Sequence, residues 1–159
     1  MTDRELSIAL REMARTQVKP LCDEWYKDWQ DGCDVDTLLE KYVKGFDFAV
    51  ENDYPPLEFI RKYFKTEDLH RHHIYLDENI HIDGGESGYY VFLGNCGGTL
   101  IIDGFKAVTA YVRHFCNIDV QAKNGSRVQV TYYDRSKGVC SDDGWSRIRK
   151  YDRTKKEGE

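Results

Sequence analysis

Histidine side chains that could bind a metal ion gather in one short segment, at the junction between the two halves of the chain. Neutral imidazole and carboxylate groups are good ligands for zinc and other divalent cations. The candidate ligands are His70, His72, His73 and His81, with Asp77 and Asp83 close by in the sequence. Because their spacing fits no metal-ligand pattern, a solvated polar linker is the competing interpretation of this segment.

Two further groups of residues could support catalysis. Asp142 and Asp143 form a carboxylate pair that could bind a cation or a sugar, although Ser-Asp-Asp-Gly is also an ordinary turn sequence. Cys116 follows His114 by two residues, so the imidazole could activate the thiol, but a buried structural cysteine is the competing interpretation. The histidines and the carboxylate pair define an alternative function, a small metal- or carbohydrate-dependent enzyme. No cofactor is expected.

The composition is that of an ordinary globular protein. The chain has 159 residues, a net charge of −5 and a pI near 5.6. This charge argues against a general nucleic-acid binder, although the basic stretch 147–156 leaves binding by that segment open. No apolar run approaches the ~20 residues that cross a bilayer, and no secretory signal follows the charged start. Five cysteines without a CxxC pair indicate free thiols, so we expect a cytoplasmic protein without a membrane partner.

The first half of the sequence has the periodicity of helices. Apolar residues recur at three- and four-residue steps, with breaks at Pro20, Gly32 and Pro55. We expect about four short helices within residues 1–70, the third of them capped by Asp36 or Thr37. The expected buried faces comprise Leu6, Leu10 and Met13; Leu21, Trp25 and Trp29; Leu38, Leu39 and Tyr42; and Leu57, Ile60 and Phe64.

The second half is a repeat. Residues 76–155 divide into eight consecutive units of ten residues without an insertion, and the fifth and seventh positions are apolar in the first six units. The ninth position favours residues that accept a sharp turn. It is occupied by Gly84, Gly94, Gly104, His114, Asn124, Asp134 and Gly144. Each unit therefore predicts about seven residues of strand with one buried face and a turn of about three.

Two architectures satisfy such a unit: a parallel β-solenoid, or an antiparallel β meander or sandwich. The constant length favours the solenoid, because an insertion would shift the register of every neighbouring coil. A coil of two units would place Cys96 over Cys116 and Val112 over Tyr132. We therefore predict an α+β protein in which a helical segment, residues 1–70, caps a short β-solenoid in the repeat domain, residues 71–159.

Regular rows of outward side chains are the candidate binding residues. Tyrosine and arginine are enriched at interface hot spots, whereas pairing between neighbouring strands is the competing explanation of such rows. The candidates are Tyr111, Arg127, Tyr133, Lys137, Arg147 and Tyr151. The open sheet edge that a solenoid leaves at its end could also pair with a second copy of the chain.

The unit that begins at Cys116, Cys-Asn-Ile-Asp-Val-Gln-Ala, and the following Ser126-Arg-Val-Gln-Val resemble the rungs of short β-solenoid proteins. Such proteins carry a helical N-terminal segment, have no known function, and occur in phages and mobile elements of gut bacteria. The resemblance covers about half of the chain and implies a non-catalytic protein-interaction module, an inhibitor or adaptor that acts on a host protein.

Overall fold

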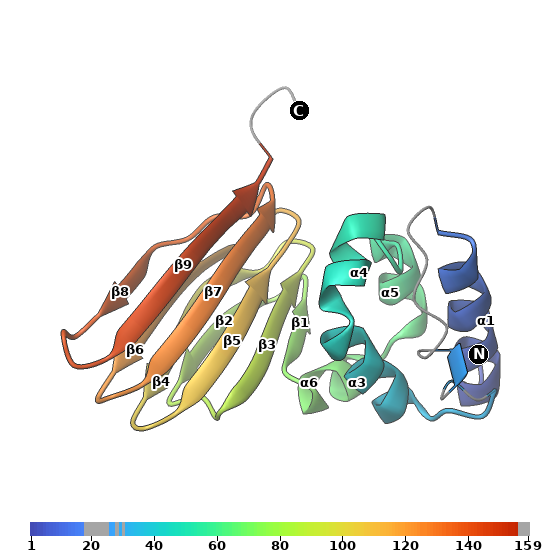
Figure 1. The fold of residues 1–159 in the computed structure, drawn as a ribbon, viewed down its shortest axis with the longest axis horizontal. Helices are drawn as coiled ribbons and strands as arrows, with labels where there is room; N and C mark the ends of the chain where they lie inside the picture. The colour runs from blue at the N-terminus through green and yellow to red at the C-terminus, as the bar shows by residue number, and fades with distance from the viewer. Residues whose placement is uncertain (18–25, 28, 30, 156–159) are drawn as a thin grey trace. The chain divides into compact units, whose positions relative to one another are not determined.

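The computed structural model describes residues 1–17, 26–27, 29 and 31–155 (Figure 1). The chain divides into two compact units, Met1–His72 and His73–Glu159. The first contains helices and the second parallel strands. The helix expected around Leu21 and Trp25 falls outside the described residues.

Five helices form the first unit within the part of the chain that the structure describes. They are α1 (Asp3–Arg15), α3 (Val35–Lys44), α4 (Phe46–Asn52), α5 (Leu57–Tyr63) and α6 (Thr66–Arg71). The periodicity of the sequence predicts α1, α3 and α5 but neither α4 nor α6. The segment that includes His70 is therefore helical and not a linker.

Local capping explains where the first helices begin. The Thr2 hydroxyl accepts a hydrogen bond from the Glu5 amide, and the Glu5 carboxylate accepts one from the Thr2 amide, so a capping box starts α1. At α3 the N-cap is Asp34, whose carboxylate accepts from the Thr37 amide at 2.8 Å. The prediction of Asp36 or Thr37 was wrong, because an aspartate two or three residues earlier already accepts from a free amide of the first turn.

The core of the helical unit is apolar with two buried polar contacts. It is built from Leu6, Leu10, Ala14, Trp29, Leu38 and Tyr54. The indole of Trp29 donates to the Ser7 hydroxyl at 3.2 Å, and the Tyr54 hydroxyl donates to the Leu10 carbonyl at 2.8 Å. Both bonds join segments far apart in the sequence, so the buried polar groups stabilise the packing of α1.

The second unit is a parallel β-solenoid of about four turns, and all of its strand pairings are parallel. The predicted fold class is thereby confirmed and the antiparallel alternative is wrong. The strands are β1 (Ile74–Leu76), β2 (Asn79–Asp83), β3 (Gly88–Leu93), β4 (Gly97–Asp103), β5 (Ala107–Val112), β6 (Asn117–Lys123), β7 (Arg127–Asp134), β8 (Cys140–Asp142) and β9 (Arg147–Thr154). Odd-numbered strands form a five-stranded sheet and even-numbered strands a four-stranded sheet (Figure 1).

Each coil contains two of the ten-residue units. From β3 onward each paired residue lies twenty positions from its partner, as in Val112 with Tyr132 and Arg127 with Arg147. The amide of Cys96 likewise donates to the sulfur of Cys116 at 3.3 Å. The coil predicted from the repeat is confirmed over this region.

The first coil departs from the twenty-residue period. Ile80 pairs with Gly98 and Ile82 with Leu100, so the unit that begins at residue 76 is shifted by two positions. Strand β2 has five residues, whereas β4 and β6 have seven. The twenty-residue register expected from the repeat is therefore wrong in this coil, although Ile80 and Ile82 still pack against the core.

The corners of the coils have the backbone conformation that the ninth position predicted. All seven ninth-position residues, from Gly84 to Gly144, have positive φ angles. His114, Asn124 and Asp134 adopt φ angles of 55°, 54° and 57°, in the left-handed region that non-glycine residues seldom occupy. Each corner therefore reverses the chain after a strand and keeps the two sheets face to face.

Even-numbered residues of strands β2 to β9 fill the space between the sheets. The buried residues of this core are Tyr90, Phe92, Cys96, Leu100, Ile102, Val108, Ala110, Val112, Cys116, Ile118, Val120, Ala122, Val128, Val130 and Tyr132. Because side chains alternate along a strand, the odd-numbered residues of β2 to β9 point away from the core. Strand β1 pairs with β3 at a seventeen-residue offset, so there the odd-numbered Tyr75 packs against the core. The strands thus present two outer faces, one on each sheet.

Candidate interaction surface

The outer face of the five-stranded sheet carries arginine but no carboxylate on the odd-numbered positions of its strands. The exposed arginines are Arg127 on β7 and Arg147, Arg149 and Arg153 on β9. We call these four residues, with Tyr111 and Tyr151, the arginine face. Within the described part of the chain, none of its four guanidinium groups has an ion pair.

The strand register brings these arginines close together. Arg127 lies directly beside Arg147 on the neighbouring strand, Gln129 beside Arg149, and Tyr133 beside Arg153. Neighbouring strands are about 4.8 Å apart and alternate residues of one strand about 6.7 Å apart. The four positive charges therefore occupy an area that a short acidic segment could cover.

Tyrosine rings cross the same sheet in a diagonal row. The rings of Tyr89 and Tyr111 stack with centroids 6.2 Å apart, and those of Tyr111 and Tyr133 lie 6.3 Å apart at 43°. Tyr133 is only 5% exposed, so it supports Tyr111 and offers little surface to a partner. Tyr151, on the terminal strand, is exposed beside Thr131.

The structure separates one predicted residue from the others. Lys137 forms a bridge with Asn117 of β6, so it belongs to the line of the four-stranded sheet. Lys137 therefore does not share a sheet face with Arg127 and Arg147, because successive ten-residue units alternate between the two sheets. Arg149 and Arg153 were not predicted as site residues, although they follow Arg147 at the two-residue spacing of a strand face.

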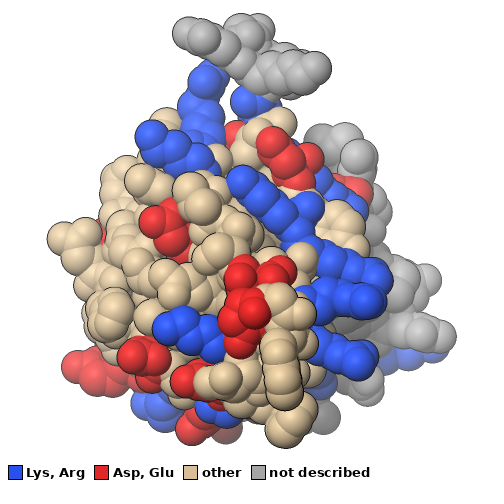
Figure 2. Space-filling model, turned by 90° about the vertical axis from the view of Figure 1, so that its left-hand side faces the viewer, with Lys and Arg blue, Asp and Glu red and all other residues tan. Residues whose placement is uncertain are grey.

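The opposite outer face has the opposite charge. On the four-stranded sheet the odd-numbered strand positions include Asp83, Asp103 and Asp119, with Lys123 as a basic residue and Lys137 in line with the same sheet. Figure 2 looks onto the end of the solenoid where β8 and β9 lie, and it shows Lys and Arg side chains in a band on its right-hand side, with carboxylates gathered beside them. The solenoid is therefore electrostatically two-sided.

A buried ion pair lies where the five-stranded sheet turns into the next corner. The Nε of Arg113 donates to Oδ2 of Asp134 at 2.9 Å, and the same oxygen accepts from the His114 amide at 3.0 Å. Burial raises the pKa of Asp134, but the hydrogen bonds from Arg113 and the amide outweigh it, so the pKa lies below its ordinary value. This pair joins two successive coils and is structural.

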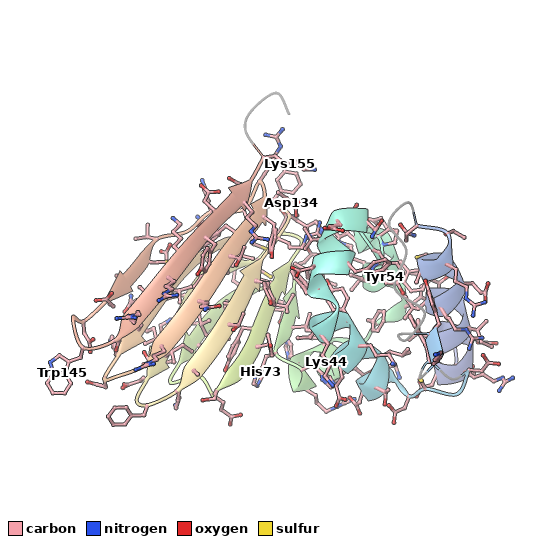
Figure 3. All side chains as sticks on the ribbon, viewed as in Figure 1. Lys44, Tyr54, His73, Asp134, Trp145 and Lys155 are labelled. Carbon is pink, nitrogen blue, oxygen red and sulfur yellow. The ribbon has the colours of Figure 1, made fainter. Side chains whose placement is uncertain are left out.

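Two large aromatic side chains project from one corner of the solenoid. Phe105 and Trp145 are both more than four-fifths exposed, at 93% and 86%. Figure 3 shows Trp145 at the tip of the turn between β8 and β9, pointing away from the sheets. A Cβ added at Gly125, in the coil between them, would meet the ring of Phe105, so the glycine leaves room for that ring.

The four predicted metal ligands lie in separate surroundings. His72 contacts Oδ1 of Asp36 through Nε2 at 2.8 Å, His73 stacks on Tyr90 with centroids 4.5 Å apart, and His81 lies exposed on the outer face of β2. His70 is exposed in α6. Among the described residues, no group of three or more histidine, cysteine or acidic side chains is arranged to hold a metal ion.

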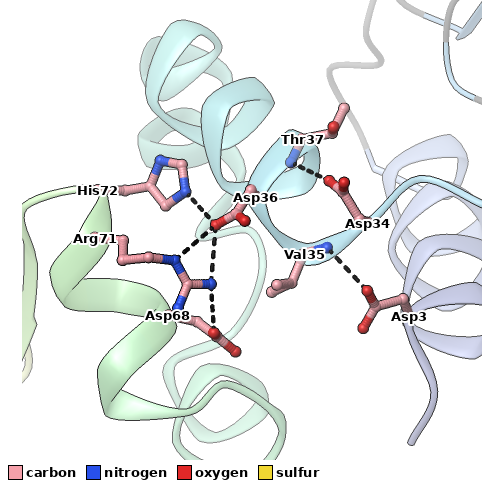
Figure 4. Close-up of polar contacts among 8 residues, drawn as sticks. All are labelled: Asp3, Asp34, Val35, Asp36, Thr37, Asp68, Arg71 and His72. Carbon is pink, nitrogen blue, oxygen red and sulfur yellow. Dashed lines mark hydrogen bonds and ion pairs between the residues drawn. The ribbon is translucent and has the colours of Figure 1, made fainter.

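Figure 4 shows the polar contacts that hold His72 in the helical unit. Arg71 donates to Asp36 at 3.0 Å and to Asp68 at 2.6 Å, so one guanidinium links α3 to the end of α6. The hydrogen bonds from His72 and Arg71 lower the pKa of Asp36. Arg71 and His72 of the predicted cluster therefore attach the end of α6 to α3.

The two carboxylates of the Asp142–Asp143 pair also make structural contacts. Asp143 accepts hydrogen bonds from the backbone amides of Asn124, Trp145 and Ser146 at 2.7, 3.0 and 2.9 Å. The bond from the Asn124 amide contributes most to lowering its pKa to about 2. Asp142 accepts from the Gly144 amide in the same turn. Both side chains thus stabilise the corner before β9, as the turn interpretation predicted.

The cysteines that the structure describes are free thiols: Cys33, Cys96, Cys116 and Cys140. The hydrogen bond with Cys96 and burial raise the pKa of Cys116, so its thiol is not activated. His114 accepts a hydrogen bond from the Gly94 amide through Nδ1 at 3.0 Å. The candidate Cys–His pair is therefore part of a coil corner.

Comparison with known proteins identifies no relative of this chain. The chain matches no protein-family model, no curated protein and no solved structure. In the part of the chain that the structure covers, no helix is long and apolar enough to span a membrane.

Proposed function

We propose that this protein is a non-catalytic interaction module that binds an acidic surface of a partner protein through the arginine face. One observation carries the proposal: four exposed arginines lie together on a sheet face whose outward strand positions hold no carboxylate. Arginine binds carboxylates through two parallel hydrogen bonds, so it suits a partner with clustered Asp and Glu.

Folding alone gives no reason for this arrangement. Arg127 and Arg147 are direct neighbours across the sheet, and like charges in such positions destabilise strand pairing. Arg149 and Arg153 add to the same field from the terminal strand. A partner that supplies carboxylates would remove this repulsion, so the free energy of binding would include its relief.

The solenoid also suits recognition because it is rigid. The tyrosine row braces Tyr111 from both sides, so its exposed edge is held in place before a partner arrives. Tyrosine and arginine anchors on a preorganised surface lose little conformational entropy on binding.

A protein partner fits this surface better than nucleic acid. The chain as a whole carries a net charge of −5, and the opposite sheet presents carboxylates that would repel a polyanion passing around the solenoid. Binding of nucleic acid by residues 147–156 is the competing proposal, and these residues lie mostly in strand β9, not in a separate tail.

The setting we propose is a reducing cytoplasm, supported by the free thiols described above. The resemblance of its rungs to solenoid proteins of phages and mobile elements supports a role as an inhibitor or adaptor of a host protein. In both roles the module acts by occupying a partner surface, without chemistry of its own.

Photo-crosslinking tests the proposal. A benzophenone amino acid replaces Tyr151 on the arginine face or Thr99 on the opposite face of the full-length protein, and crosslinked proteins are identified from nuclease-treated cell lysate. We expect one reproducible acidic partner at position 151 only, and its loss in an Arg127→Glu/Arg149→Glu variant. A Lys123→Glu variant is the matched control and should retain it.

Three results would contradict the proposal. Equal crosslinking from positions 151 and 99 would show a non-specific surface, and crosslinking that Arg127→Glu/Arg149→Glu leaves unchanged would remove the role of the arginines. Crosslinking that occurs in untreated lysate and is absent from nuclease-treated lysate would assign the face to nucleic acid.

A further inference from the structure

Strand β9 ends the five-stranded sheet and has one free edge. It pairs with β7 along all eight of its residues, and no described strand lies on its other side. Edge strands expose backbone amides and carbonyls that can pair with another chain. This edge is the longest such template in the solenoid, because β8, the last strand of the other sheet, has only three residues.

The ladder identifies which backbone groups are available. The amides of Arg147 and Lys155 donate to the carbonyls of Ser126 and Asp134, toward β7. Backbone groups alternate in direction along a strand, so even-numbered amides point to the free edge. These are the amides of Ile148, Lys150, Asp152 and Thr154. The Thr154 amide already donates to the Asp152 carboxylate at 3.0 Å, which leaves three for an added strand.

Side chains on both surfaces of β9 define what would fit there. Outward, an added strand would lie beside Arg147, Arg149 and Arg153. Inward, it would lie over Ile148, which packs against the solenoid core, and over Lys150. The Lys150 ammonium lies 5.2 Å from the centre of the Tyr132 ring and donates to the Gly138 carbonyl at 2.9 Å. An added strand therefore meets positive charge outside, and inside it meets apolar Ile148 followed by Lys150 and Asp152.

A second copy of the chain does not suit this edge. Strand β9 carries four basic residues and one carboxylate, so two β9 edges brought together would repel each other. The same charges attract a chain of opposite sign. The arginines thus exclude self-pairing and select an acidic partner.

We propose that β9 receives an extended acidic segment of the partner protein as an additional strand of the sheet, with carboxylates beside the arginines and an apolar residue over Ile148. This inference rests on the proposed function, because it takes the occupant to be a protein. It adds the mode of binding, main-chain pairing at a sheet edge, in which alternate side chains give specificity.

Amide hydrogen exchange of the full-length, ¹⁵N-labelled protein tests this mode. The probe is a soluble eight-residue peptide that alternates Glu and Val, and the control alternates Lys and Val. At a concentration near ten times its Kd, the acidic peptide should slow exchange of the Ile148, Lys150 and Asp152 amides about tenfold. The amides of Arg149 and Tyr151, which point toward β7, should change much less.

A second peptide separates edge pairing from attraction to the arginines. It has the same Glu-Val sequence, with N-methyl groups on alternate residues, so the amides along one edge of the peptide cannot donate hydrogen bonds. A matched peptide carries the N-methyl groups on the other set of alternate residues, along its opposite edge. One of the two should lose the protection and bind at least about tenfold more weakly, which is a loss of about 1.4 kcal/mol. Added salt should weaken the unmodified peptide.

The outcomes distinguish the two proposals. Equal binding of all acidic peptides, without slower exchange at the edge amides, would overturn edge pairing and leave the arginine face intact. Equal protection by the Lys-Val peptide would overturn selection for acidic chains. Protection that grows with protein concentration in the absence of peptide would assign the edge to a second copy and overturn the inference.

Discussion

Replacing Asp134 with asparagine should destabilise the solenoid more than any loss of a surface ion pair. The side chain of Arg113 is 4% exposed and that of Asp134 20% exposed, and two hydrogen bonds join them. Removing one partner of a buried pair costs roughly 3–5 kcal/mol, because the other charge stays buried without compensation. Since asparagine keeps one acceptor oxygen, we expect a cost near the lower end, about 3 kcal/mol.

Replacing Arg113, the other member of the pair, should destabilise the protein less. Arg113→Met removes the more deeply buried charge and leaves Asp134, which is more exposed and still accepts from the His114 amide. We expect about 1–2 kcal/mol for this variant. The double variant should cost less than the two single costs together, with a coupling energy of about 2 kcal/mol.

The effect should also depend on pH in a defined direction. The pKa of Asp134 is lower in the folded protein than its ordinary value, so its contribution to stability is present above the unfolded pKa of about 3.9. That contribution is lost as pH falls through the folded pKa. The difference between wild type and Asp134→Asn should therefore be full at pH 7 and shrink below about pH 4.

Urea denaturation followed by circular dichroism at β-sheet wavelengths measures these free energies in the full-length protein. The control is Asp119→Asn, on the outer face of the other sheet and without an ion pair in the described part of the chain. If Asp134→Asn and Arg113→Met were additive within about 0.5 kcal/mol, the two side chains would not be coupled and the reasoning would be refuted.

Three further predictions concern the coil geometry and its corners. Gly98→Ala should lower the free energy of unfolding by at least about 2 kcal/mol more than Gly88→Ala, as measured by urea denaturation. Both glycines have positive φ, but only a Cβ at residue 98 meets a backbone carbonyl, that of Ile80 on the neighbouring strand. Tyr132→Phe should cost about 1–3 kcal/mol, since its buried hydroxyl donates to a backbone carbonyl, whereas exposed Tyr151→Phe should stay within about 0.5 kcal/mol. The carboxylate of Asp143 should titrate near pH 2 by NMR, so its contribution to stability is retained at pH 4 and lost only as pH falls through that value.

The repeat was readable from the sequence because packing inside a solenoid acts on single positions. Leu100, Val120 and Val130 are fully buried, and one polar residue at such a position would break the core. The ninth-position turns were readable for a similar reason, since few residues accept a positive φ. Both constraints act locally and leave a trace at a fixed period.

The first coil and the short helices were less predictable. Strand β2 keeps the apolar alternation of Ile80 and Ile82, so the sequence pattern gives no sign that it pairs two residues out of step. Helix α6 has six residues, of which Leu69 is buried, too few for a helical period to stand out. Tertiary packing, not propensity, decides such elements.

The candidate sites were misread where the ten-residue unit was used in place of the coil. Residues ten apart have the same position in a unit and lie on opposite sheets, whereas residues twenty apart lie side by side. At the twenty-residue period Arg127 and Arg147 share a face, whereas Lys137 lies in line with the other sheet. The acidic residues Asp83, Asp103 and Asp119 lie on the outer face of the other sheet.

This separation of charge has a consequence for any strand added to the solenoid. Continuing the five-stranded sheet beyond β9 extends the arginine face, and continuing the four-stranded sheet beyond β8 extends the outer face that carries Asp83, Asp103 and Asp119. A segment whose outward residues are acidic is therefore attracted at β9 and repelled beside β8. The charge pattern directs an incoming chain to one of two neighbouring edges, and β9, with eight residues against three, also offers it the longer ladder.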